Sequence, residues 1–151
     1  MEKYYKREGR RFVQVDLSQS VDNAGKYYQQ DGTFVSERTK DSIGLCIISY
    51  ATHHVVMYLN EINGGFTHSE ALVAAKNYFS GKGELPQVNE LLTALIYYKE
   101  KLGLVTWCDY RALNVSASYA ARVDHDGYAN TYAALATSYI TALRPIVRVK
   151  Q

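Results

Sequence analysis

The sequence predicts an α+β fold in which two helices pack on short antiparallel sheets, and two patterns of apolar residues lead to this prediction. Apolar runs at residues 43–48 and 55–59, separated by polar residues 50–53, are typical of a hairpin of well-covered strands. Apolar side chains then recur at helical spacing within residues 71–79 and 86–102. The chain has 151 residues, of which 47% are hydrophobic and 21% charged, so it can form one domain whose core needs neither metal nor disulfide.

The N-terminal end is basic and is predicted to be an arm. Residues 12–15 alternate between apolar and polar side chains and predict a short strand. We therefore assign residues 1–16 to a basic arm with the first strand, and residues 17–151 to the domain. The domain opens with an irregular connection that ends in a turn at residues 31–32. The arm is either solvated or docks on an acidic partner surface, in which case its assembly residues are Lys3, Lys6, Arg7, Arg10 and Arg11.

The histidines and cysteines of the sequence predict no metal site. Neighbouring residues of a strand point to opposite faces, so His53 and His54 cannot bind one ion together, and we assign both to the turn of the hairpin. Cys46 lies in an apolar run and is predicted to be a small buried side chain. A disulfide with Cys108 stays open, because the spacing of the two cysteines does not argue for it. No cofactor is predicted.

Capping and breaking residues give the predicted ends of the two helices. Thr67 and Glu70 form a capping-box pattern at the start of the first helix, and Gly81 is predicted to end it. Pro86 is suited to the first position of the second helix, and Gly103 ends that helix. The apolar stripe of the second helix is assigned to the domain's own core rather than to the groove of a partner.

Large hydrophobic residues become rare in residues 109–142. This segment is mostly Ala, Ser, Thr, Tyr, Asn and Asp, and it contains no Pro, Lys or Glu. Gly127 predicts a turn between residues 119–123 and 128–132, and residues 143–149 restore an alternating strand. The chain contains 14 tyrosines against 4 Phe and 1 Trp, and tyrosine combines a large contact area with a polar tip, as recognition surfaces require. We therefore expect an irregular C-terminal display segment.

Several short motifs stand in a defined order along the chain. They are a turn and an apolar strand at residues 31–34 and 43–47, a Leu-Pro and then Glu-Leu helix start within 83–91, a strand with Trp107 at 106–109, the hairpin glycine Gly127, and the sequence Arg-Pro-Ile-Val-Arg within 143–148. This order resembles that of C-type-lectin-like domains related to the formylglycine-generating enzyme. It resembles more closely the variable proteins of diversity-generating retroelements and their relatives in gut bacteria and phages. The resemblance covers most of the chain and implies a C-type-lectin-like fold.

In that family, the segment between the Trp strand and the Arg-Pro strand displays the ligand-binding surface. Retroelement mutagenesis acts on adenines in codons and tends to leave the small polar residues and tyrosine that fill residues 109–142. A low-complexity linker, or a helix over residues 132–142, is the alternative. The calcium–sugar motifs Glu-Pro-Asn and Trp-Asn-Asp are absent, and Cys46 and Cys108 do not reproduce the enzyme's cysteine pair. Neither calcium-dependent sugar binding nor the enzyme's activity is therefore carried over.

The resemblance implies a binding module, and the lack of a secretory signal favours a virion component over an exported adhesin. We expect a phage fibre or decoration protein on the virion surface that binds a host-surface glycan or protein without catalysis. It is expected to attach to other virion proteins through the arm and to form a dimer or trimer. The expected ligand-binding residues, whose tyrosines should face solvent on one side, are Tyr110, Asn114, Tyr119, Asp124, His125, Tyr128, Asn130, Tyr132 and Tyr139.

Two other functions are weighed against this one. An enzyme would use His125 as its acid–base group, tuned toward neutral pH by Asp124 and Asp126, but no nucleophile, phosphate-binding loop or metal motif accompanies it. We therefore predict no catalytic residue. The stronger alternative is a structural assembly protein whose tyrosine-rich face is buried between subunits. The net charge of +2 does not call for a nucleic-acid partner, and no apolar run approaches the length of a membrane span.

Overall fold

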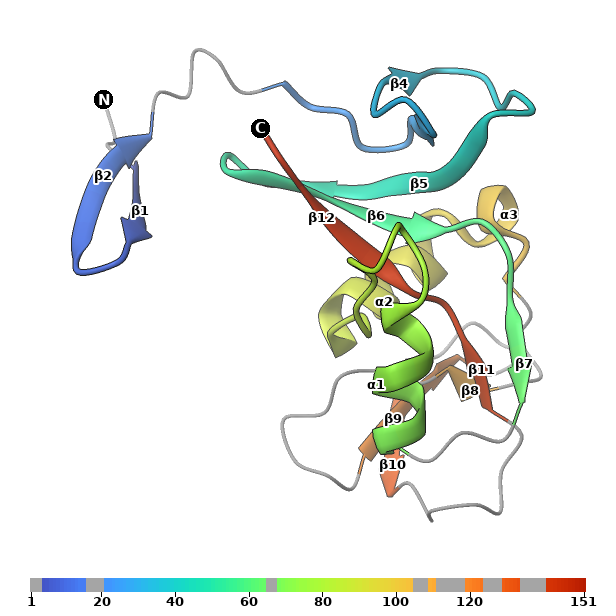
Figure 1. Ribbon diagram of the computed structural model, residues 1–151. Helices are drawn as coiled ribbons and strands as arrows, with labels where there is room; N and C mark the ends of the chain where they lie inside the picture. Colours follow the sequence, from blue (N-terminus) through green and yellow to red (C-terminus); the bar gives the residue numbers. More distant parts are fainter. Residues whose placement is uncertain are drawn as a thin grey trace.

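The structure, a computed structural model, describes seven parts of the chain. They are residues 4–15, 21–64, 68–104, 109–110, 119–123, 129–133 and 141–151. Within these residues the chain forms helices, a two-stranded sheet and two five-stranded sheets, and most strand pairs are antiparallel (Figure 1). The α+β class is therefore confirmed. The strand that was predicted around Trp107 lies outside the described residues.

The first five-stranded sheet, which we call the scaffold sheet, is built on the predicted hairpin. Its central strands are β5 (Ser42–Ser49) and β6 (His53–Tyr58), and its order is β12-β6-β5-β3-β4. The remaining strands are β3 (Tyr27–Gln29), β4 (Phe34–Val35) and β12 (Ile146–Lys150). Leu45 and Met57 pack in the main core on one face, whereas Cys46 and Val56 belong to a second cluster on the other face. Both faces are covered, which explains why the apolar runs are continuous rather than alternating.

The second five-stranded sheet, which we call the display sheet, contains four of the expected ligand-binding residues, Tyr110, Tyr119, Asn130 and Tyr132. Its order is β10-β9-β8-β11-β7, and its edge is the predicted hairpin of β9 and β10. The strands are β7 (Ile62–Gly64), β8 (Asp109–Tyr110), β9 (Tyr119–Val123), β10 (Ala129–Ala133) and β11 (Thr141–Leu143). Figure 1 shows β9 and β10 at the opposite end of the molecule from β5.

The C-terminal strand that the sequence predicts as one element is two strands in different sheets. β11 ends at Leu143 in the display sheet, and β12 begins at Ile146 in the scaffold sheet. The chain crosses at Arg144 and Pro145, and Pro145 presents a carbonyl that accepts a hydrogen bond from the Tyr58 N–H at 2.9 Å. Proline has no N–H to donate to a strand ladder, so a break at this position follows from its chemistry.

The two helical regions are confirmed, but the first helix is shorter than expected. Helix α1 (His68–Lys76) ends five residues before the predicted stop at Gly81. Phe79, Ser80 and Gly81 all have positive φ, at 52°, 56° and 83°. These φ values lie in the left-handed region of the backbone. Phe79 and Ser80 therefore cannot continue a right-handed helix, and the chain leaves the helix before the glycine.

The second helical region begins later than predicted. Glu84 pairs with Ile146 in an isolated β-bridge, which holds this part of the chain extended, and α2 (Val88–Tyr97) starts two residues after Pro86. Gln87 is the residue before the helix, and its N–H donates to Glu90 Oε1 at 2.9 Å. The predicted single helix is divided at Tyr98, where the backbone leaves the helical conformation with a φ of −128°. A separate short helix α3 (Lys99–Leu102) follows, and it ends as predicted at Gly103, which has a φ of 61°.

Helix α2 positions the two sheets relative to each other. Leu91 and Leu95 of α2 are buried in one cluster with Leu45 of the scaffold sheet and with Tyr110 and Ala142 of the display sheet. The helix also packs directly against both β5 and β9. The predicted assignment of its apolar stripe to the domain's own core is therefore confirmed. A smaller cluster joins α1 to the display sheet through buried Ala71, Ala75, Leu85 and Leu143.

The N-terminal arm contains a β-hairpin of its own, of which the sequence predicted one strand. β1 (Tyr4–Glu8) pairs antiparallel with β2 (Arg11–Val15) through a turn at Gly9 and forms the two-stranded sheet. Tyr5 is 55% exposed and Phe12 is 72% exposed. Figure 1 shows this hairpin to one side of the two larger sheets.

The turn of the scaffold hairpin lies earlier than predicted. His53 and His54 are the first two residues of β6, so their assignment to the turn is wrong. His54 is buried with its ring 4.9 Å from that of Phe34, while the ring of His53 lies against Tyr50. The predicted turn near Asp31 is confirmed, since the Thr33 N–H donates to Asp31 Oδ1 at 3.0 Å and Gly32 has a φ of 88°.

Within residues 17–32, which were predicted to be irregular, the structure places strand β3 (Tyr27–Gln29). Tyr27 pairs with Leu45 of β5 on one side and with Val35 of β4 on the other. A three-residue strand without apolar alternation leaves little trace in a sequence. It forms here because β5 offers it a partner.

Candidate ligand-binding surface

The β9–β10 hairpin is the part of the expected ligand-binding segment whose backbone the structure places. Its register pairs Asn130 with Arg122, Tyr132 with Ala120, and Tyr119 with Ala133. Directly paired residues share a face of a sheet, and residues two apart in a strand share it too. Asn130, Tyr132 and Arg122 therefore hold positions on one face, and Tyr119 holds a position on the other.

Tyr110 identifies which of these faces is the inner one. It pairs with Ala121 of β9 and with Ala142 of β11, and both Tyr110 and Ala142 are buried in the main core. The strand positions that share this face, including Tyr119, belong to the core side of the display sheet. The opposite face holds the positions of Arg122, Asn130 and Tyr132. Arg122 was not among the expected binding residues, although the alternation of β9 could have indicated it.

The expectation that Tyr110 faces solvent is wrong. Its exposed fraction is 0%, and its hydroxyl donates a hydrogen bond to Glu61 Oε1. Tyr110 is the second residue of β8, and its ring is buried in the main core with Leu91 and Leu95 of α2. Composition alone gave Tyr110 the same assignment as the other tyrosines. A buried tyrosine with a paired hydroxyl is a structural residue.

The hydrogen bond from Tyr110 belongs to a network that fixes the display sheet. Arg144 is 2% exposed and lies 3.5 Å from Glu61, and its Nη1 donates to the carbonyl oxygens of Tyr58 at 3.1 Å and Leu59 at 2.9 Å. Glu61 therefore links Tyr110 of β8 to Arg144 at the crossing between the sheets. Such a network orients its members because each buried polar group needs its partner. Arg144 therefore serves to hold the display sheet in place rather than to contact a ligand on its outer face.

This network reaches the surface at a polar pocket of about 360 Å³. Glu61 and Arg144 line it together with Arg38, Glu100 and Lys101. The charges of these side chains are mixed, and Lys101 donates to the Gly25 carbonyl at 3.0 Å. The pocket therefore offers hydrogen-bonding groups of both signs beside the display sheet.

A second ion-pair site fixes α2 on the scaffold sheet. Arg148 of β12 binds the carboxylate of Glu90 through two hydrogen bonds of 2.7 and 2.9 Å, and Glu84 lies 3.5 Å from Arg148 Nε. The hydrogen bonds to Glu90 raise the pKa of Arg148 above its ordinary value. Glu90 is 1% exposed, and it also accepts the N–H of Gln87 at the start of the helix. A two-point contact of this kind determines the orientation of the helix as well as its position.

A hydroxyl and an imidazole meet within the scaffold hairpin. Ser49 Oγ lies 2.8 Å from His54 Nδ1, and the Asn23 N–H donates to the same oxygen at 2.9 Å. His54 is 4% exposed, and burial lowers its pKa. Because His54 is covered and Ser49 already accepts from Asn23, this trio joins the segment before β3 to the hairpin. Cys46 beside it is buried, as predicted. It is a free thiol, and burial raises its pKa.

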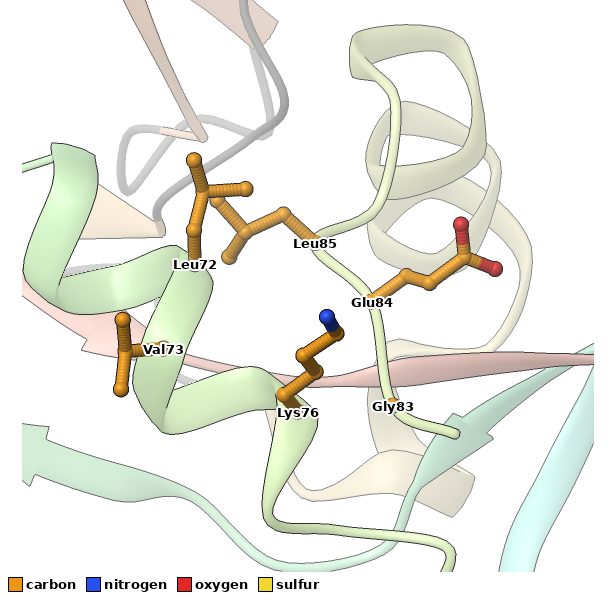
Figure 2. Close-up of a pocket in the computed structure, with 6 residues that line it drawn as sticks. All are labelled: Leu72, Val73, Lys76, Gly83, Glu84 and Leu85. Carbon is orange, nitrogen blue, oxygen red and sulfur yellow. The ribbon is translucent and has the colours of Figure 1, made fainter. Parts of the chain in front are cut away.

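An apolar groove of about 400 Å³ lies beside α1 (Figure 2). Leu72 and Val73 of α1 form one wall, and residues 83–85 form the other. Figure 2 shows Leu72 and Leu85 directed toward each other, with the Lys76 amine between the walls and Glu84 pointing away from α1. Leu85 is buried, whereas Val73 is 68% exposed. The groove is thus continuous with the cluster that joins α1 to the display sheet.

The remaining expected residues are placed only in part. Tyr119, Asn130 and Tyr132 have strand positions as described above. Arg7, Arg10 and Arg11 of the arm are exposed, and Lys6 lies in β1. Outside the described residues lie Lys3, Asn114, Asp124, His125, Tyr128 and Tyr139.

Comparison with known proteins gives no relative: no protein family, curated protein or solved structure matches the chain. The likeness to C-type-lectin-like domains therefore rests on the order of the sequence motifs. Among the residues that the structure describes, no group of three or more His, Cys, Asp or Glu is placed to hold a metal ion. No helix in the described part of the chain is long and apolar enough to cross a membrane.

Proposed function

We propose that this chain is a binding module on the surface of a phage virion, with a C-type-lectin-like fold, and that it contacts a host-surface glycan or protein without catalysis. The ligand-contacting surface is the outer face of the β9–β10 hairpin, with the positions of Arg122, Asn130 and Tyr132, extended by the remaining residues of the display segment. Tyr110 and Tyr119 belong to the inner side and are not part of this surface.

One observation supports this proposal above the others. The hairpin is the edge of a sheet whose base is fixed by the buried contacts of Tyr110, Glu61 and Arg144. In the strands of the hairpin, Val123 is the single large aliphatic residue. A surface of aromatic and small polar residues on a rigid base binds with little loss of side-chain entropy.

The arm serves assembly in this proposal. Its hairpin is a separate sheet with exposed Arg7, Arg10 and Arg11 and with the exposed rings of Tyr5 and Phe12. Cations around an apolar patch fit an acidic, partly apolar surface of another virion protein. The subunits are proposed to form a dimer or trimer, as virion fibres are symmetric oligomers.

The test is binding of the labelled full chain to a panel of gut bacterial strains and to a glycan panel. The double variant Asn130→Ala/Tyr132→Ala should lose binding at least tenfold, because a few aromatic residues carry most of the energy of an interface. The matched control is Asn89→Ala/Tyr97→Ala, which removes the same two residue types from exposed positions on α2. Loss of binding in both variants, or in neither, would rule out the proposed surface.

The alternative function is that of a structural assembly protein whose display face is buried between subunits. Four of the ten residues in β9 and β10 are alanine, and small residues allow close approach of a second copy. In that case the Asn130→Ala/Tyr132→Ala variant dissociates into monomers in light scattering, and the unmodified chain binds none of the cells or glycans.

A further inference from the structure

A pocket of about 370 Å³ lies between the N-terminal hairpin and the C-terminal strand. Three separate parts of the chain contribute to it, and cations predominate among its charged groups. Its lining is formed by Arg7 and Glu8 of β1, Thr52 and His53 at the start of β6, and Arg148, Lys150 and Gln151 at the C-terminal end.

The strand register explains why cations gather here. Lys150 pairs with His53, and Arg148 pairs with Val55. These residues share the face of the scaffold sheet that carries the buried pair of Ile146 and Met57 two residues further into the core. The same face of the sheet is therefore apolar where α2 covers it, and it carries cations toward the C-terminal end of β12.

Two of these cations have no carboxylate partner among the described residues. Arg148 is bound by Glu90 and Glu84. Arg7 donates its Nε to the backbone carbonyl of Gly9 at 3.0 Å, and neither Arg7 nor Lys150 forms an ion pair within the described part of the chain. Glu8 supplies the carboxylate of the lining and has another interaction of its own. The pocket thus presents two cations from separate elements, Arg7 and Lys150, that form no ion pair within the described residues.

The polar wall between these cations is fixed in place. Thr52 Oγ1 and His53 Nδ1 lie 2.9 Å apart, and the His53 ring packs on Tyr50 with 4.9 Å between centroids. Gln151 donates its N–H to the Thr52 carbonyl at 3.1 Å and accepts the Val21 N–H at 2.7 Å. A site with preordered polar groups loses less entropy when a ligand binds.

We propose that this pocket binds an oxyanion, such as phosphate or sulfate, between Arg7 and Lys150. Guanidinium and ammonium groups make strong, charge-assisted hydrogen bonds to such anions, and Thr52 and His53 supply further polar contacts. The bound anion joins the β1–β2 hairpin to β12 of the scaffold sheet. The proposal is independent of the host-binding surface, which lies on the display sheet.

The test is a titration of the full chain with inorganic phosphate at constant ionic strength, followed by amide chemical shifts in NMR. Saturable shifts are expected at the amides of residues 52–53, 150 and 7. Arg7→Gln and Lys150→Gln should each weaken binding about tenfold, because a hydrogen bond to a charged group contributes about that factor. Lys82→Gln, an exposed lysine outside the pocket, is the matched control and should leave the affinity unchanged.

The source of the anion is found by repeating the titration with a sulfated disaccharide and its unsulfated form. Tighter binding of the sulfated disaccharide than of inorganic sulfate identifies an acidic glycan, and equal or weaker binding identifies a free ion. Linear, non-saturating shifts, or an equal loss in Lys82→Gln, would overturn the proposal. The Asn130→Ala/Tyr132→Ala variant should retain phosphate binding, so failure of the host-binding proposal is distinguished from failure of this one.

Discussion

The two five-stranded sheets of this chain use different amino acids to stay folded. The scaffold sheet buries branched aliphatic residues on both faces, with Leu45 and Val55 on one side and Val56 on the other. The described strands of the display sheet contain mostly Ala, Thr, Asn and Tyr. The display sheet is therefore held at a few points, by the side chain of Leu143 and by the contacts of Tyr110. Stability concentrated in one sheet leaves the other able to change its surface residues.

Replacing Tyr110 is the strongest way to break this division. Tyr110→Ala should lower the free energy of unfolding by about 3–5 kcal/mol, because it removes a fully buried ring from the junction of α2 and both sheets. Tyr110→Phe keeps the ring and removes the donor to Glu61, at a cost of about 1 kcal/mol. Urea denaturation measures both. If Tyr110→Ala lowers the free energy of unfolding no more than the exposed control Tyr97→Ala does, the display sheet is not anchored at this residue.

Replacing Arg148 tests the anchoring inside the scaffold. Arg148→Gln leaves the Glu90 carboxylate buried without its cation and should cost about 2–3 kcal/mol. This is less than for a fully buried pair, because the Arg148 side chain is 29% exposed and solvent screens it. The control Glu84→Gln removes the outer contact and should cost less than about 1 kcal/mol. Equal losses in thermal unfolding would show that Glu90 does not depend on Arg148.

The smallest expected effect is a dependence of the scaffold's stability on pH. Burial lowers the pKa of His54 below its ordinary value of 6.5, so the unfolded chain binds a proton before the folded chain does. Stability is therefore greatest above that value and falls as the pH drops through it. His54→Gln should flatten this slope in urea denaturation. An unchanged slope would mean that other groups cause the dependence.

Elements that leave a signal in a few neighbouring residues were predictable from the sequence. The run from residues 43–48 indicated β5 because both faces of that strand are covered, and Gly127 indicated the hairpin of β9 and β10. Gly103 likewise ended its helix, since its φ of 61° favours glycine. In each case the signal lies within a few residues of the element that it predicts.

Features that depend on distant partners were not predictable. The Tyr110 ring is buried in a core built from distant parts of the chain, and Glu61, far away in the sequence, accepts its hydroxyl. Composition cannot reveal such contacts. Pro86 was expected to open a helix, but the bridge between Glu84 and Ile146 keeps that part extended. β1 was not predicted because its charged residues do not alternate with apolar ones, and it forms a strand through pairing with β2. In both sheets, the features that escaped prediction are those that depend on residues far away in the sequence, such as β3 in the scaffold sheet and Tyr110 in the display sheet.

The pairing of β8 with β11 has a consequence for how the chain can vary in length. Asp109 lies beside Thr141 in this parallel pair, so the segment between them begins and ends at neighbouring points of one sheet. The entropy of closing a loop grows only with the logarithm of its length, and each doubling costs about 0.6 kcal/mol. Insertions and deletions between β8 and β11 therefore cost little where they leave the strands β9 and β10 intact and β8 and β11 in place. Evolution can change the chain length between these strands as well as their residues, while the pairing of the strands stays the same.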